Sequence, residues 1–201
     1  MSTELKMTGL LRNEVMSDLG RPHPFAAERV GFVFGRLATL PDGGHLILFT
    51  HYHSIPDDQY LRDDRVGARI GPEAMTWAMQ AVYQGRTARE GIFHVHVHEH
   101  PGKTDMSRVD RDEIPKLLPG FQSVGRDAPH GIIILSMDHG SAWAWLPGSI
   151  RGTEVNCISV IGTPIEVFER KAPAPAAAPK PARTFFGTIA NFLERILRLG
   201  R

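Results

Sequence analysis

Histidine at every second position of one short segment restricts the fold more than any other feature. Residues 91–100 read GIFHVHVHEH, with histidine at positions 94, 96, 98 and 100. Side chains alternate between the faces of a β-strand, so the pattern predicts a strand with four imidazoles on one face. Neighbours on that face lie about 6.5–7 Å apart, a span that one zinc ion with bonds of about 2 Å bridges. A solvated sheet face is the competing interpretation, and the further metal-binding residue types in the adjoining turn count against it.

Strand-like and helix-like segments alternate along the first 170 residues. Pro41 and the residues after it form a predicted turn, and Pro119 with Gly120 is expected to end a helix. Strands are expected at residues 29–40, 45–53, 91–100, 130–137, 141–146, 154–161 and 164–168, and helices at residues 8–20, 72–84 and 107–118. This order predicts a single α/β domain over residues 1–170, with a mostly antiparallel or mixed sheet and flanking helices.

The last 31 residues differ in composition from this domain. Residues 171–183 contain four prolines and six alanines, which predicts a semi-rigid Ala/Pro-rich linker. Residues 184–201 place their large apolar side chains on one side of a helical projection, which predicts an amphipathic helix. That helix could dock on its own domain, bind a protein partner or lie on an acidic membrane surface. The long linker favours the protein partner over the other two roles.

Composition and charge exclude several classes of protein. No apolar run is long enough to span a bilayer, and residues 1–11 lack the features of a secretory signal. A single cysteine, Cys157, excludes an internal disulfide framework and a cysteine-based zinc site, which favours the cytoplasm. Residues 1–170 hold 17 basic and 21 acidic residues, and this acidic balance argues against binding of nucleic acid.

The turn after the histidines supplies candidates for a third metal ligand. Asp105 and Asp110 both follow the histidine segment closely. Two imidazoles, one carboxylate and an open fourth position are the arrangement of a catalytic zinc site. The sequence therefore predicts one zinc ion per chain, held by two of the four histidines and a carboxylate.

Two motifs resemble a known family. His98, His100 and Pro101, followed by Ser107 and by Asp110 three residues later, resemble the JAMM signature of JAB/MPN-domain zinc metalloproteases. Upstream, the stretch that begins at Glu28 reads ERVGFVFG and resembles the Glu-x-x-Gly-x-x-x-Gly motif of the same family. The order of the expected elements also agrees, and the resemblance covers about residues 8–150.

The spacing of the signature leaves two histidine pairs open as ligands. The family pattern has seven residues between the second histidine and the serine. With His98 and His100 as the pair the gap is six, and with His96 and His98 it is eight. Because Pro101 directly follows His100, the resemblance favours His98 and His100, with Asp110 as the third ligand. His94 and His96 are then core residues or partners that orient the ligands.

The resemblance implies a fold, an activity and partners. The fold would be a JAB/MPN-like, cytidine-deaminase-like domain, and the activity that of a prokaryotic-type zinc metallopeptidase or isopeptidase. Glu28 would move the proton of the attacking water, and Ser107 would stabilise the oxyanion. Substrates would be ubiquitin-like proteins or their conjugates, and the enzymes of the conjugation pathway would be further partners.

Other interpretations of the same residues stay open. Ser107 is also a suitable N-cap for a helix whose third residue is Asp110. The same ligand set would serve a zinc amidohydrolase that acts on a small amino-acid conjugate. A non-catalytic MPN scaffold is the third alternative, and the unusual spacing before Ser107 is the feature that favours it.

Overall fold

A large mixed sheet organises the chain. In the computed structural model, which describes residues 2–62, 67–162 and 166–169, this sheet has nine strands in the order β11-β10-β1-β3-β2-β6-β7-β8-β9. Its strands are β1 (Thr3–Thr8), β2 (Val30–Thr39), β3 (His45–Ser54), β6 (Glu90–Val97), β7 (His130–Leu135), β8 (Gly140–Trp145), β9 (Thr153–Glu154), β10 (Cys157–Ile161) and β11 (Glu166–Glu169). The short strands β4 (Tyr60–Leu61) and β5 (Arg69–Ile70) form a separate antiparallel pair. The described residues are therefore a mixed α/β domain, as the sequence predicts.

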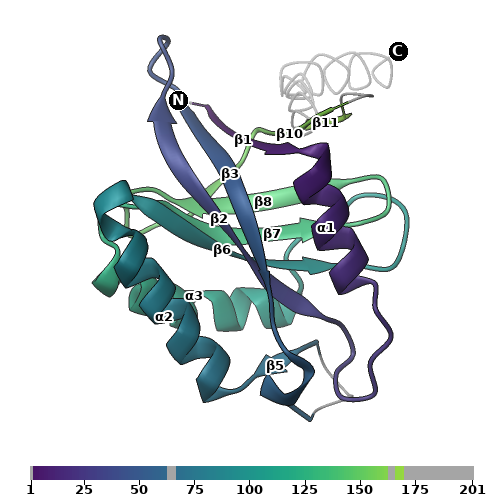
Figure 1. The fold of residues 1–201 in the computed structure, drawn as a ribbon. Helices are drawn as coiled ribbons and strands as arrows, with labels where there is room; N and C mark the ends of the chain where they lie inside the picture. Colours follow the sequence, from purple (N-terminus) through teal and green to yellow (C-terminus); the bar gives the residue numbers. More distant parts are fainter. Residues whose placement is uncertain (1, 63–66, 163–165, 170–201) are drawn as a thin grey trace, which may run out of the picture. The chain divides into compact units, whose positions relative to one another are not determined.

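Three helices pack against the sheet (Figure 1). They are α1 (Gly9–Leu19), α2 (Pro72–Gly85) and α3 (Arg108–Val124). Alternate residues of the central strands belong to different clusters, because successive side chains leave opposite faces of a strand. On β2, Val33 packs with the α1 side chains, whereas Phe32 and Phe34 pack with those of α2 and with Phe121 of α3. Helix α1 thus covers one face of the sheet, and α2 with α3 covers the other.

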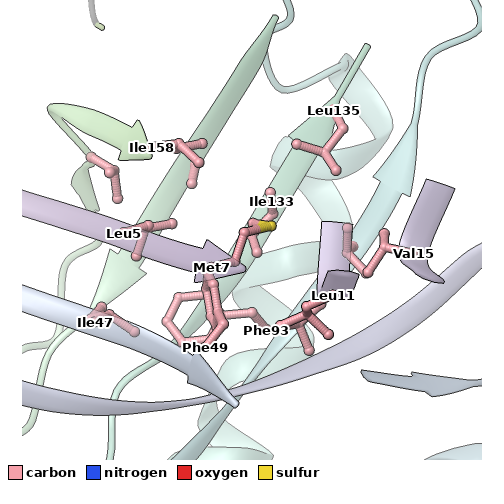
Figure 2. Close-up of a cluster of buried hydrophobic side chains, with 14 of the residues drawn as sticks. Leu5, Met7, Leu11, Val15, Ile47, Phe49, Phe93, Ile133, Leu135 and Ile158 are labelled. Carbon is pink, nitrogen blue, oxygen red and sulfur yellow. The ribbon is translucent and has the colours of Figure 1, made fainter. Parts of the chain in front are cut away.

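The core on the α1 face is built from several strands at once. Figure 2 shows Leu5, Met7, Phe49 and Phe93 gathered between the sheet and α1. The rings of Phe49 and Phe93 meet edge to face, with centroids 5.0 Å apart. This apolar layer fixes the side of each strand that turns inward, so the opposite side of β6 must carry its histidines.

Most expected elements are confirmed. The hairpins of β2 with β3 and of β7 with β8 are antiparallel and form where the sequence places them. Strand β1 and the pair β4 and β5, in a segment without a period-two pattern, were not expected from the sequence. The single strand expected over residues 154–161 is divided into β9 and β10, which lie apart in the sheet. The linker over residues 171–183 and the amphipathic helix over residues 184–201 lie outside the described residues. No helix among the described residues is long and apolar enough to cross a membrane.

Two expected boundaries were wrong. The expected strand over residues 91–100 ends at Val97, so only part of the histidine pattern lies on β6. Helix α3 does not end at Pro119 but continues to Val124, with Pro115 and Pro119 inside it. Both prolines lie on the exposed side, whereas Ile114, Leu118 and Phe121 on the other side of α3 are buried. Burial of that face outweighs the cost of about 3 kcal/mol for a proline inside a helix.

The proline at position 119 makes α3 less stable than its packing allows. We expect Pro119→Ala to raise the free energy of unfolding by about 1–2 kcal/mol. Alanine restores an N–H donor within the helix and removes the clash of the proline ring with the preceding turn. Part of this gain is offset, because alanine gives the unfolded chain more conformational freedom than proline does. Thermal and urea unfolding measure the change. Lys116→Ala, at an exposed site on the same helix, is the control and should stay within about 0.5 kcal/mol. A lower stability of Pro119→Ala would contradict this account of α3.

Candidate metal centre

The end of β6 positions the histidines. Strand β6 pairs antiparallel with β2 and parallel with β7, which places His94 opposite Phe32 and His96 opposite Val30. His96 is fully buried, and His94 lines a cavity beneath the sheet. Their side chains share the face of the sheet that α2 and α3 cover, since the intervening Val95 belongs to the α1 core. The imidazoles of His94 and His96 are thus held in the interior of the protein.

The structure brings together His96 and His98, not His98 and His100. Residue 98 lies just beyond β6, but its N–H still donates to the carbonyl of Leu135 on β7 at 2.8 Å. The Nε2 atoms of His96 and His98 are 3.2 Å apart. His100 is exposed, and its Nδ1 lies 3.0 Å from the carbonyl oxygen of Pro101. The ring of His100 still neighbours that of His98, with centroids 5.6 Å apart, but it adds no atom to the cluster described below.

Asp110 reaches the same place from the first turn of α3. The Asp110 carboxylate accepts the Ser107 N–H at 2.8 Å, and the Ser107 hydroxyl accepts the Asp110 N–H at 3.1 Å. This reciprocal capping box holds a carboxylate that is 9% exposed. Its Oδ2 lies 3.8 Å from Nε2 of His96. Ser107 is therefore an N-cap, as one sequence interpretation predicts, and its hydroxyl proton is still free to be donated.

The loop between His98 and Ser107 is fixed at two points. The Gly102 N–H donates to the Asp138 carboxylate at 2.6 Å, and the Ser136 hydroxyl donates to the Gly102 carbonyl at 2.9 Å. The Thr104 hydroxyl, in a residue only 2% exposed, donates to the Ile134 carbonyl at 3.2 Å. These bonds hold the start of α3 against β7 and the β7–β8 turn, which brings Asp110 to the histidines.

Glu28, two residues before the start of β2, is the third member of the group. One ligand atom from each of Glu28, His96 and His98 lies within 4.8 Å of the other two. Gly67 allows this carboxylate to be close, because a Cβ there would lie 3.2 Å from its Oε1, and its φ of +52° is in the left-handed region that favours glycine. Burial, with a further contribution from the charge of Asp110, raises the pKa of Glu28 from 4.5 to about 7.

The histidines are neutral in this environment. Burial lowers the pKa of His96 and of His98, and it lowers the pKa of His94 to about 4. Neutral imidazole is the form that binds metal ions. With bonds of about 2.0–2.1 Å, the ligand atoms of a tetrahedral zinc ion lie about 3.3 Å apart, so separations of 3.2 and 3.8 Å fit such an ion. Nε2 of His96 therefore lies at a suitable distance from one atom of His98 and one of Asp110, whereas the residues whose ligand atoms all lie within 4.8 Å of one another are Glu28, His96 and His98, without Asp110.

A cavity of about 760 Å³ adjoins these residues. At one end it is lined by polar groups of the centre, among them Glu28, His98, Ser107 and Asp110. Its other walls combine the apolar residues Ile70, Met75, Ile114 and Leu117 with the charged residues Arg69, Glu113 and Lys116. A molecule in this cavity would meet the polar groups of the centre and a mixed apolar and charged wall.

The histidines on β3 do not join the centre. The ring of His51 stacks on Phe34 with centroids 4.5 Å apart, and the ring of His53 stacks on Trp77 of α2 at 3.3 Å. Their His-x-His spacing repeats that of β6, but aromatic neighbours occupy the ring faces. Both are stacking residues in this fold.

Comparison with known proteins adds no family. No family model matches the chain, and no curated protein matches it. Among solved structures, the chain is similar to the Trichoplax adhaerens STIL N-terminal domain, with 10% sequence identity and a TM-score of 0.30. The match covers 70% of this chain and 41% of that chain. A likeness this weak carries no argument about fold or function.

The ligand assignment makes a direct prediction about metal content. Purified wild-type protein should hold about one zinc ion per chain, and His96→Ala and His98→Ala should each lose it. His100→Ala is the matched control and should keep the metal, because this exposed ring contributes no atom to the cluster. Elemental analysis after dialysis measures the content. Loss of zinc in His100→Ala but not in His96→Ala would restore the pair that the sequence motif favours.

Glu28 should make the metal-free protein less stable at high pH. A carboxyl whose pKa is raised by folding stabilises the protein below its unfolded pKa of 4.5, and this stabilisation is lost as pH rises through about 7. Glu28→Gln removes the buried charge. We therefore expect metal-free Glu28→Gln to exceed the wild type by on the order of 2–3 kcal/mol at pH 8, and to differ little below pH 4.5. Urea unfolding in the presence of a chelator tests this, and a difference independent of pH would contradict it.

Proposed function

We propose that this protein is a zinc-dependent hydrolase of amide bonds, with His96, His98 and Asp110 as zinc ligands and Glu28 as the general base. The observation that carries the proposal is the convergence of Glu28 with two neutral histidines around one point, beside a cavity. A half-buried carboxyl with a pKa of about 7 is suited to accept and return a proton near neutral pH. The JAB/MPN-like motifs of the sequence agree with this assignment of roles.

The histidine pair differs from the one that the sequence motif favours. With His98 as the second ligand, eight residues separate it from Ser107, one more than in the family pattern. The anchored loop absorbs this difference, because Ser107 and Asp110 are positioned by the contacts of Gly102 and Thr104. Loops tolerate such insertions when their ends are fixed.

The residues divide the chemistry between them. Bound zinc would lower the pKa of a water molecule towards about 7 and polarise the scissile carbonyl. Glu28 takes a proton from the attacking water and later delivers it to the leaving amine. Ser107, whose oxygen already accepts the Asp110 N–H, donates a hydrogen bond from its hydroxyl to the developing oxyanion. The presence of every one of these groups supports an enzyme over a non-catalytic scaffold.

The length of the cavity supports an extended polypeptide as substrate. Its lining on α3 runs from Ser107 to Leu117, ten residues and therefore about 15 Å of helix. An extended chain of four to five residues has that length. The C-terminal tail of a ubiquitin-like protein, the substrate class that the family resemblance implies, is such a chain. A small amino-acid conjugate would leave much of the cavity unfilled.

Exchange of the base tests this proposal. Glu28→Gln should lower kcat by 10²-fold or more on a fusion of a ubiquitin-like tail to a fluorogenic amine, because no other group takes the proton. Its zinc content should equal that of the wild type, since Glu28 is not among the proposed ligands. Asp110→Ala should lose both zinc and activity. Wild-type turnover by Glu28→Gln would refute the role of Glu28, and a zinc-loaded wild type inactive on every amide would refute the proposed function.

A further inference from the structure

The Tyr60 hydroxyl forms hydrogen bonds with the backbone of β2 at a position that β3 no longer reaches. The last pair between the two strands joins Gly31 to Ser54, so Val30 lies beyond it. The N–H and the C=O of a strand residue point to the same side. Here both meet one group, since the Val30 N–H donates to the Tyr60 hydroxyl at 3.1 Å and the hydroxyl donates to the Val30 carbonyl at 2.8 Å. The buried hydroxyl thus replaces the missing strand.

Arg29 binds the same turn. Its side chain is 1% exposed, and its Nη1 lies 2.9 Å from the carboxylate of Asp57. Its Nε also donates to the Arg21 carbonyl at 3.0 Å. Asp57 and Tyr60 belong to one short segment, in which a 3₁₀ turn over Asp57–Gln59 leads directly into β4. This turn therefore holds the two residues that follow Glu28, each by a different kind of contact.

The residue before Glu28 is held as well. The Ala27 N–H donates to the Gly67 carbonyl at 2.9 Å. Positions 27, 29 and 30 are thus each bonded to neighbouring segments, and Glu28 lies among them with its carboxylate beside His96 and His98. On its other side Val30 is paired with His96, so one residue links the Tyr60 contact to a proposed ligand.

We propose that Tyr60 is a positioning residue for Glu28, which its hydroxyl holds in place through the backbone of Val30. This inference rests on the proposed function, in which Glu28 carries the proton. Tyr60 does not line the cavity and touches no reacting atom. Displacement of a catalytic group by about 1 Å can cost 10²-fold in rate, so the loss of one remote hydroxyl is measurable.

Tyr60→Phe tests the proposal, because it removes only the hydroxyl. We expect kcat to fall at least tenfold while KM and zinc content stay within twofold of the wild type. Tyr52→Phe is the matched control. It also removes the hydroxyl of a partly buried tyrosine, one that donates to Asp18 at 2.6 Å, and it should leave kcat within twofold. Equal losses of kcat in both variants would show a merely structural role and overturn the proposal.

Two further variants tie the effect to Glu28. In a Glu28→Gln background, Tyr60→Phe should lower the residual rate less than twofold, because the group that it positions is gone. Asp57→Asn changes an exposed side chain that holds the same turn, and it should lower kcat at least threefold. This variant tests the proposal if Tyr60→Phe does not fold. Wild-type kcat in every folded variant would overturn the inference and leave the proposed function intact.

A measurement on metal-free protein tests the contact without turnover. Amide hydrogen exchange at Val30 should be at least tenfold faster in Tyr60→Phe than in the wild type, whereas Tyr52→Phe should not change it. Unchanged exchange in Tyr60→Phe would overturn the role of the hydroxyl. A wild type that is inactive on every amide would instead overturn the proposed function, and the inference with it.

Discussion

The antiparallel pairing of β2 with β6 is the constraint on which the centre depends. Antiparallel strands place the start of one beside the end of the other. Glu28 lies two residues before β2 begins, and the histidines lie at and just beyond the end of β6, so the pairing of Val30 with His96 brings them together. Both strands lie inside the sheet, each with neighbours on both sides, so neither is free to shift its register. Residues 68 positions apart in the chain are neighbours for this reason alone.

Burial favours the neutral form of both the carboxyl group and the imidazoles of the centre. It raises the pKa of Glu28 and lowers the pKa values of His96 and His98, so each group favours its neutral form in the metal-free protein. Asp110, at the start of α3, accepts the Ser107 N–H and lies 3.8 Å from His96. Two neutral imidazoles with carboxyl groups beside them are ligand types that suit a divalent cation such as zinc. The fold thus supplies the preorganisation that the proposed chemistry needs.

The sequence predicts what depends on local pattern. The hairpins, α1 and the start of α3 follow from turn residues and capping. The motif brings in Glu28 and His98, which the structure places in one cluster, and Asp110, which lies near His96 but outside that cluster. The choice between His96 and His100 could not be predicted, because the end of β6 is set by neighbouring strands. Tyr60 gave no signal either, since its segment has no period-two pattern and its role arises only where β3 ends. Pro119 wrongly predicted the end of α3, because the helix continues for the sake of burying its opposite side, which is a tertiary effect.

The loop before Ser107 shows that residue count and distance are separate quantities. Gly102 and Thr104 are tied to β7 and its turn, so extra residues between the ties and the histidines would bulge outward without moving α3. A motif defined by a fixed number of intervening residues measures the length of the chain, whereas chemistry requires only that the side chains meet. Sequence searches built on rigid gaps would therefore overlook proteins in which such a tethered loop has gained or lost a residue. Patterns that allow this gap to vary, and that ask for the tethering residues as well, would recover them.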